Sequence, residues 1–321
     1  MNTLAFIVQQ MLYVAIPLLV VSLGGLFSER GGIVNIALEG IMVFGTFFGV
    51  ITLFFLQNHM SGQLLYIVAM LASILAGLAM GAVHAFAAIN MNADQTISGT
   101  AINMFAPAFT VYIARLLYSV KEIPFRNEFL IRKVPFLSEI PIVGKLFFTN
   151  AYISTYIGIA ILFIATFVIY KTRFGLRLRS AGENPHALDA AGGNVKRIRW
   201  AGVLISGALA GLGGLIITVP ISTSFTGTAN GYGFLALAIL IFGQWRPKTI
   251  FFSSLFFALA LTLSNVYSGI PFLNGLGIPD QVFKMLPYIA TLVVLVFTSK
   301  KSAAPKAAGQ PYDAGNVKLE Y

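Results

Sequence analysis

"RFGLRLRSAGENPHALDAAGGNVKRIRW", residues 173–200, is the stretch that decides the fold of this chain. It gathers eight charged side chains between two long apolar runs, 151–170 and 201–221, in a sequence of which only 10% is charged. Apolar runs of about 20 residues are long enough to cross a bilayer as helices. The contrast therefore predicts a charged loop that joins two membrane spans.

The composition extends this interpretation to the whole chain. Its 321 residues are 57% hydrophobic, and the charged fraction of 10% is small. A soluble domain carries roughly 25% charged residues. We therefore expect an all-α fold, a polytopic membrane helical bundle. The sequence contains no cysteine, which excludes disulfides, thiolate catalysis and cysteine-bound metal.

Nine apolar runs give the expected spans. The first is interpreted as a retained span, because the N-terminus lacks the charged region and small-residue cleavage site of a signal peptide. The seventh run is short for a span. The runs lie at about 5–26, 36–56, 63–89, 97–118, 151–170, 201–221, 231–243, 250–270 and 285–299.

Basic residues predict the orientation. The formal charge of +10 comes from Lys and Arg at the ends of apolar runs, which the positive-inside rule explains without a nucleic-acid partner. The loop 171–200 and the tail 300–321 are basic and fall on one side, taken as the cytoplasm. We expect a transmembrane domain over 1–299, N-out and C-in, with an extracytoplasmic loop over 119–150 and a flexible cytoplasmic tail over 300–321.

An internal echo suggests an inverted repeat. Segments 23–45 and 207–243 share a Gly-rich span, a polar break and a helix that ends in Phe-Gly. Asp94-Gln95 before the fourth span is echoed by Asp280-Gln281 before the ninth. Each pair falls on opposite faces in the predicted topology, as an inverted repeat requires.

Small residues four apart predict close helix contacts within the bundle, because they let helix backbones approach each other in lipid. The pairs are Gly45/Gly49, Gly77/Gly81 and Gly207/Gly211.

Polar side chains within or beside apolar runs are candidates for the wall of a solute path. Glu39 follows Asn35 by four residues, so the two share a helix face. A carboxylate in a span should face protein or a watery cavity. Two roles stay open for Glu39: a polar wall near the path, or a fixed hydrogen bond that stabilises the break at 28–32. Asp94 belongs to the candidate set, as do Asn103 and Asn265, for which a structural role is favoured.

The motifs do not predict an enzyme. The sequence has no G-x-x-x-x-G-K-[ST], so the chain cannot cradle ATP itself. Its three histidines lie in separate segments without metal-ligand spacing, and no nucleophile–base arrangement is visible. We expect no cofactor and no metal.

Four motifs in order resemble permease subunits of bacterial ABC importers, in the superfamily of ribose and branched-chain amino-acid permeases. They are "SERGGIVNIALEGIMVFG" (28–45), "NADQTISGTAINMFAP" (92–107), "TRFGLRLRSAGENPHALDAAGGNV" (172–195) and "GYGFLALAILIFGQWRPKT" (231–249). Within this group the chain looks most like simple-sugar and nucleoside permeases. The resemblance implies a multi-pass subunit of the bacterial cell membrane that leaves ATP hydrolysis to a partner.

The resemblance also implies that "GENPHALDAAG" docks into a groove on a cytoplasmic ATPase. Asn184 as cap and Pro185 at the first position predict a short helix, which Gly192 ends. A basic loop that only sets topology is the alternative, and the capped helix favours docking. The residues expected to couple to the ATPase are Gly182, Glu183, Asn184, Pro185, His186, Ala187, Asp189, Ala190 and Gly192.

The same resemblance implies the other partners. They are an ATP-binding cassette ATPase with tandem cassettes, a second permease in a heterodimer, an extracytoplasmic substrate-binding lipoprotein and the surrounding membrane lipid. A nucleoside is the expected solute, and a simple sugar such as ribose or galactose is the alternative. An ion-coupled secondary transporter is the rival class, disfavoured because few ionisable side chains lie in mid-span.

Overall fold

The computed structural model describes residues 2–119, 122–141, 143–267 and 303–313, with a few isolated residues between 279 and 292. Within this part, seven helices are long and apolar enough to cross a membrane. They are α1 (Asn2–Arg30), α2 (Leu38–Leu56), α3 (Gly62–Ala85, continued by the π-helix η1, Phe86–Asn90), α4 (Gln95–Tyr118), α6 (Ile153–Lys171), α9 (Val195–Ile221) and α11 (Pro247–Val266).

Two of the nine expected spans are not among these seven. The seventh expected span is α10 (Tyr232–Phe242), an apolar helix of 11 residues. At a rise of 1.5 Å per residue it is about 16 Å long, roughly half the thickness of a hydrocarbon core. The ninth expected span, 285–299, lies outside the described residues apart from isolated positions.

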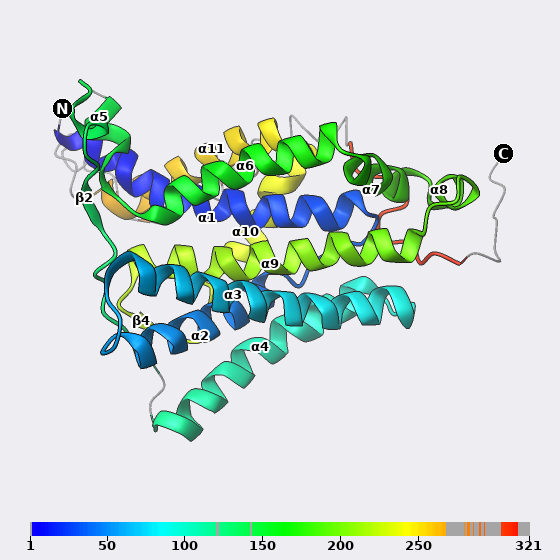
Figure 1. Cartoon of the computed structure of the whole chain (residues 1–321), viewed down its shortest axis with the longest axis horizontal. Helices are drawn as coiled ribbons and strands as arrows, with labels where there is room; N and C mark the ends of the chain where they lie inside the picture. The colour runs from blue at the N-terminus through cyan, green and yellow to red at the C-terminus, as the bar shows by residue number, and fades with distance from the viewer. Residues whose placement is uncertain are drawn as a thin grey trace.

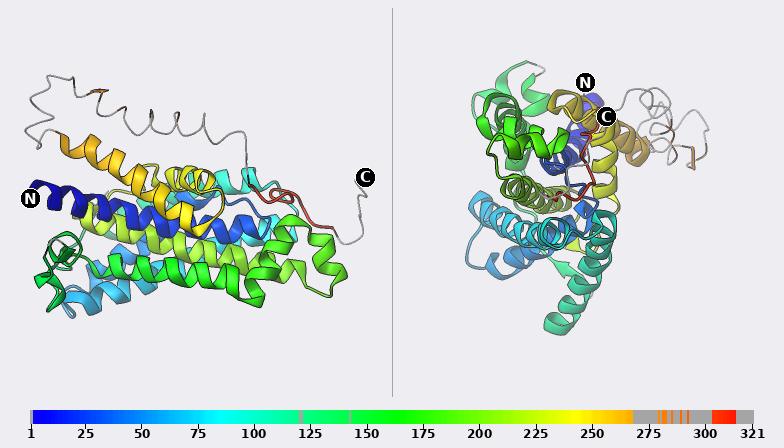
Figure 2. Two further views of the ribbon diagram at one scale, coloured as in Figure 1. Left: turned by 90° about the horizontal axis from the view of Figure 1, so that it is seen from above. Right: turned by 90° about the vertical axis from the view of Figure 1, so that its right-hand side faces the viewer.

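The long helices run side by side along the long axis of the molecule (Figure 1). α9 packs against α1 on one side and against α2 and α3 on the other. In its most apolar stretch 72% of α9 is buried, against 28% for α4. α9 is therefore the central helix, and α4 leans away from the bundle at its edge (Figures 1 and 2).

Glycines allow the close packing around α9. A Cβ on Gly81 would lie 3.1 Å from the Cα of Gly207, and one on Gly77 would clash with the Gly207 carbonyl oxygen. Gly45 of α2 meets the backbone of Gly211 in the same way. The predicted helix contacts within the bundle are confirmed at these positions, where α2, α3 and α9 approach backbone to backbone.

Short elements close one end of the bundle. β1 (Ile123–Pro124) pairs with β4 (Ser224–Phe225), and β2 (Ile131–Lys133) pairs with β3 (Thr149–Ala151), both antiparallel. The 3₁₀ helix η2 (Leu137–Glu139) and α5 (Val143–Phe147) lie between β2 and β3. The fold is therefore mostly helical, with two small β-pairs where the sequence predicted an extended loop, because backbone pairing satisfies polar groups that the loop would leave open.

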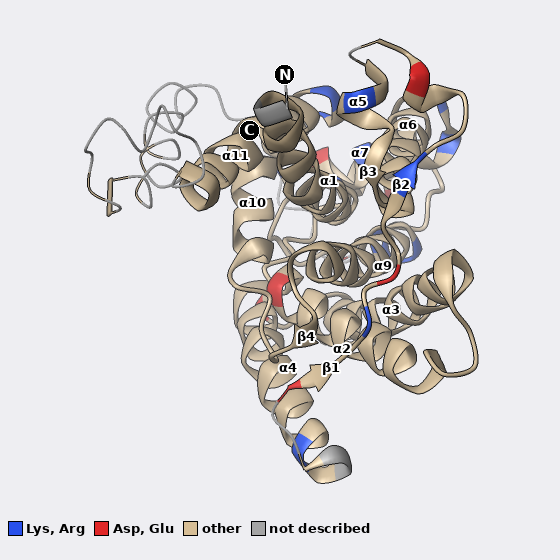
Figure 3. Ribbon diagram, turned by 90° about the vertical axis from the view of Figure 1, so that its left-hand side faces the viewer, with Lys and Arg blue, Asp and Glu red and all other residues tan. Residues whose placement is uncertain are grey.

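The other end carries α7 (Arg173–Glu183), α8 (Pro185–Ala190), the turn between α10 and α11, and residues 303–313 (Figures 1 and 2). Charged residues sit mainly at helix ends and in connecting segments, while the ribbon along the helices is almost free of them (Figure 3). The basic loop and the segment 119–150 thus lie at opposite ends of the bundle.

Candidate functional site

α7 and α8 form a capped elbow at the end of the bundle. Thr172 caps α7 by accepting a hydrogen bond from the Gly175 N–H at 3.1 Å. Asn184 Oδ1 accepts from the Ala187 N–H at 3.0 Å, and Pro185 occupies the first position of α8. Gly192 at φ +78° follows the end of α8, a conformation that suits glycine. The short capped helix predicted from the sequence is present.

The residues expected to couple to an ATPase divide by exposure. Gly182 and Pro185 are buried, and His186 is half-buried. A Cβ on Gly182 would clash with the Arg30 carbonyl, so this glycine fits α7 onto the end of α1. The exposed members, open to a partner, are Glu183, Asn184, Ala187, Asp189, Ala190 and Gly192.

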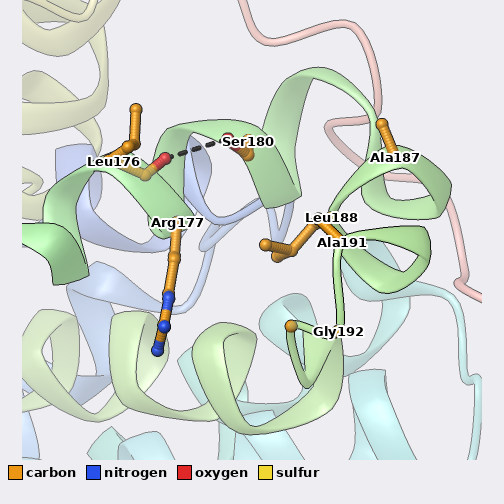
Figure 4. Close-up of a pocket in the computed structure, with 8 residues that line it drawn as sticks. Leu176, Arg177, Ser180, Ala187, Leu188, Ala191 and Gly192 are labelled. Atoms are coloured by element: carbon orange, nitrogen blue, oxygen red, sulfur yellow. Dashed lines mark hydrogen bonds between the residues drawn. The ribbon is translucent and has the colours of Figure 1, made fainter.

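A hollow lies between α7, α8 and the turn that follows (Figure 4). Leu188 points into it from α8, and the long side chain of Arg177 extends beside it from α7. Its lining residues are Leu176, Arg177, Ser180, Ala187, Leu188, Ala191, Gly192 and Gly193. The elbow therefore offers a partner a partly apolar hollow with a cation at its side.

A polar network ties the elbow to two other segments at this end. Arg30 contacts Glu183 at 3.5 Å, and its Nη2 donates to the Trp245 carbonyl at 2.9 Å. Trp245 Nε1 in turn donates to the buried Glu29 carboxylate at 2.6 Å. The end of α1, the end of α7 and the turn between α10 and α11 are thereby joined.

Residues 303–313, which we call the C-terminal strap, lie across the same end. The Ala307 N–H donates to the Gly182 carbonyl at 2.8 Å, and the Gly309 N–H donates to the Gly32 carbonyl at 3.1 Å. Arg199 Nη1 of α9 donates to the Gln310 carbonyl at 3.0 Å. Within the described part of the tail expected over 300–321, backbone groups of the strap thus pair with groups of the bundle.

The polar break between α1 and α2 is held by side chains from two other helices, α9 and α4. Asn35 Nδ2 donates to Ser206 Oγ of α9 at 2.8 Å. Asn103 of α4 donates to the Ile36 carbonyl at 2.9 Å and accepts from the Gly40 N–H at 2.7 Å. The two bonds of Asn103 satisfy backbone groups that a broken helix would otherwise leave unpaired.

Glu39 joins α2 to α10. Its two carboxylate oxygens accept from the backbone N–H groups of Gly231 at 2.8 Å and Gly233 at 2.6 Å. A carboxylate is favoured at a helix N-terminus, where unpaired N–H groups and the helix dipole meet it. The fixed hydrogen bonds of Glu39 thus lie at the start of α10, and not at the break at 28–32 where the sequence analysis placed them.

The remaining candidates lie elsewhere. Asp94 is exposed and caps α4, with Oδ1 accepting from the N–H groups of Thr96 at 2.8 Å and Ile97 at 3.0 Å. Asn265 is exposed near the end of α11. The structure therefore brings Asn35, Glu39 and Asn103 together around the start of α2 and leaves Asp94 and Asn265 apart from them.

Three residues near the end of the bundle that carries α7 and α8 make contacts that the sequence did not predict. Gln95 Oε1 accepts from the Val34 N–H at 2.7 Å, and a ring nitrogen of His84 contacts the Val34 carbonyl at 3.1 Å. Arg199 is buried, with only 2% of its surface exposed. A polar residue near the end of an apolar run was the only signal, and such residues usually face water at the membrane surface.

A comparison with protein families decides the class. The chain matches the model of the permease component of the branched-chain amino acid transport system over residues 7–295. The chain belongs to this permease family. It is accordingly a multi-pass protein of the cell membrane and the non-catalytic membrane component of an ABC transporter. Such a permease implies an ATPase and a substrate-binding protein as partners.

Individual permeases match over nearly their whole length. The nucleoside ABC transporter permease NupC of Lactococcus lactis is 44% identical, over 97% of this chain and 98% of that protein. The guanosine ABC transporter permease NupQ of Bacillus subtilis is also 44% identical, with the same coverage. The putative glucose ABC transporter permease TsgC13 of Haloferax volcanii is 28% identical over 93% of this chain and 94% of that protein. No solved structure matches the chain.

Proposed function

We propose that this permease forms the translocation path of an ATP-driven importer for a nucleoside. The identity of the solute rests on the full-length similarity to two permeases named for nucleoside and guanosine transport. The observation that carries the mechanism is α8, a short capped helix exposed at the end of the bundle. The elbow is exposed, so another protein can bind to it.

The exposed residues of 182–193 are the proposed contact with the ATPase. Ala187, Ala190 and Gly192 have little or no side chain, so a partner surface can approach the backbone of α8 closely. Glu183 and Asp189 add charge at its rim. Gly182 and Pro185 serve the same contact indirectly, since they set the position and the start of the helix.

The proposed topology has nine spans, with the N-terminus outside and the C-terminus in the cytoplasm. The positions of α7, α8, the turn after α10 and the strap at one end support it, because these segments carry the basic residues that the positive-inside rule assigns to the cytoplasm. Residues 119–150 are then extracytoplasmic. The ninth span would be supplied by 285–299.

An inverted repeat is part of the proposal. α2 and α10 each follow an extended break, at 31–37 and 222–231, and their first turns meet at Glu39. α2 runs from this meeting point toward the end that holds 119–150, and α10 runs toward the end that holds α8. Two broken helices of opposite direction that meet inside a bundle are typical of inverted repeats around a transport path.

The polar residues are proposed to shape the path in different ways. Asn35, Glu39 and Asn103 hold the two breaks, and thus fix where the backbone opens inside the membrane. Asp94 sets the start of α4, the helix that leans from the bundle. Asn265 is exposed on α11 and open to a partner or to solute.

The proposed complex contains a second, different permease, an ATPase with tandem cassettes and an extracytoplasmic lipoprotein that delivers the nucleoside. Closure of the ATPase displaces residues 182–193, and the bundle rocks so that the path opens from the outside to the inside. The binding protein supplies selectivity, so affinity along the path itself can be weak.

The test is uptake of labelled guanosine, uridine and ribose by the reconstituted complex, with and without ATP. We expect ATP-dependent uptake of a nucleoside. Uptake that persists under an ion gradient without ATP would replace the importer with an ion-coupled secondary transporter.

A simple sugar is the second candidate solute. The 28% identity to a permease named as a putative glucose transporter favours it. Uptake of ribose or glucose with both nucleosides ignored would select this candidate and leave the importer class intact.

A further inference from the structure

The C-terminal strap contacts a different element at almost every step. Besides its bonds to Gly182, Gly32 and Arg199, the Ala303 N–H donates to Gln244 Oε1 in the turn after α10 at 2.8 Å. The Tyr312 ring lies 5.3 Å from the ring of His186 in α8, centroid to centroid. Eleven residues thus connect α7, α8, α9, the segment after α1 and the turn after α10 (Figure 2).

Tyr312 completes a small apolar core of its own beneath α8. It is buried, with 8% of its surface exposed, and packs with Ala181 of α7, Leu188 of α8 and Val195 at the start of α9. This cluster is separate from the main core of the bundle. A helix of six residues is not stable alone, so the orientation of α8 depends on this cluster.

Arg199 fastens the strap to α9. Its guanidinium lies 6.0 Å from the centre of the Tyr312 ring, and Nη1 holds the Gln310 carbonyl. Nε and Nη2 have no hydrogen-bond partner among the described residues. A buried cation with two open donors costs free energy, which a role in stability alone does not explain.

The strap also reaches the break between α1 and α2. Gly309 bonds to Gly32, at φ +91°, and the chain runs on from Gly32 through Asn35 to Glu39. A Cβ on Gly32 would meet Arg199 Nη2 at 2.9 Å, so the strap, α9 and the break are in direct contact. Displacement of α8 therefore has a short route through the strap to the segment that positions the first turn of α2.

We propose that the C-terminal strap positions α8 and carries its displacement to the segment 31–37, with Tyr312 and Arg199 as positioning residues. This inference rests on the proposed docking of the ATPase on α8. The strap thus connects the elbow, which the ATPase moves, to the break between α1 and α2, which shapes the path.

The test uses the whole reconstituted complex and compares solute uptake with ATP hydrolysis. Tyr312→Ala removes the ring from the cluster beneath α8. We expect uptake per ATP to fall roughly tenfold, the factor that corresponds to about 1.4 kcal/mol, while the ATPase still co-purifies. Tyr312→Phe keeps the ring and should behave as the unaltered protein. Gln310→Ala is the matched control in the strap, because this exposed residue contacts its neighbours through backbone atoms.

A covalent rescue covers the case in which Tyr312→Ala fails to insert. The chain has no cysteine, so His186→Cys with Tyr312→Cys introduces one unique pair. Uptake per ATP should be low in the unreacted pair and should recover when a short bifunctional thiol reagent joins the two positions. Normal uptake before reaction, or no recovery after it, would overturn the inference.

Ala187→Trp separates this inference from the proposed function. Ala187 is exposed on α8 and is not among the strap contacts, so the larger side chain should block the ATPase. If Ala187→Trp is inactive and Tyr312→Ala keeps normal uptake per ATP, the strap is passive and docking stands. If both variants behave as the unaltered protein, docking on α8 is itself wrong.

Discussion

Glu39 Oε2 accepts a hydrogen bond from the Gly233 N–H at 2.6 Å, across 194 residues of sequence. The bond joins the first turn of α2 to the first turn of α10, inside the bundle. α10 is about 16 Å long, and the turn at its C-terminal end places Trp245 beside Arg30 at the end of α1. The N-terminus of α10 therefore lies roughly 16 Å from the end of α1. Both broken helices therefore depend on one carboxylate.

Removal of this carboxylate should destabilise the bundle. In Glu39→Ala the N–H groups of Gly231 and Gly233 lose their acceptor, and the buried Gly233 group alone costs about 1–3 kcal/mol when it is left unsatisfied. Glu39→Gln keeps one acceptor oxygen, so its unfolding midpoint should lie between those of the unaltered protein and Glu39→Ala. The measurement is the thermal unfolding of the detergent-solubilised permease. An unchanged midpoint in Glu39→Ala with lost uptake would show instead that Glu39 serves the solute and not the break.

The contact between α3 and α9 leaves no room for a side chain at Gly211. A Cβ at this position would meet the Gly77 Cα at 2.8 Å and the Ser73 carbonyl. Gly211→Leu should therefore force the helices apart at a cost of about 1–3 kcal/mol or more and lower the unfolding midpoint. Ala160→Leu, at an exposed position of α6, is the control and should leave the midpoint unchanged. Equal midpoints for the two variants would contradict the close approach.

The cap at Asn184 should control the local stability of α8. Asn184→Ala removes the acceptor for the Ala187 N–H, a loss of about 1 kcal/mol. Hydrogen exchange followed by mass spectrometry should then be roughly fivefold faster across residues 185–191, with the global midpoint unchanged. Asn184→Asp keeps an acceptor oxygen and should restore protection. Unaltered exchange in Asn184→Ala would mean that the apolar cluster alone holds the helix.

Arg199 should matter more for coupling than for stability. Replacing a buried ion by an apolar residue of similar volume is often neutral or stabilising, so Arg199→Met should not lower the unfolding midpoint. It should lower uptake per ATP, because the strap loses its bond to α9. Arg197→Met, at an exposed position on the same helix, should change neither quantity. A lower midpoint with normal uptake per ATP would assign Arg199 a structural role only.

Local patterns in the sequence predicted the features that depend on neighbouring residues. Apolar runs predicted seven of the spans, because a helix of about 20 apolar residues is long enough to cross the hydrocarbon core of a bilayer. The Asn184-Pro185 pair and the glycine at 192 gave α8, since helix caps act within one turn. Glycines four apart marked the contact of α3 with α9, because that spacing places both on one helix face.

The tertiary structure alone decided which distant groups meet. The sequence left Glu39 between two roles, and its partners proved to be backbone N–H groups almost 200 residues away, which no side-chain pattern records. The contacts of the strap could not be predicted for the same reason. Its hydrogen bonds to Gly182 and Gly32 are made by backbone groups, which leave no mark in the amino-acid composition. Sequence thus determined which segments enter the membrane and where each helix starts and stops. The fold determined the pairings, because they depend on backbone groups brought together only when the helices pack.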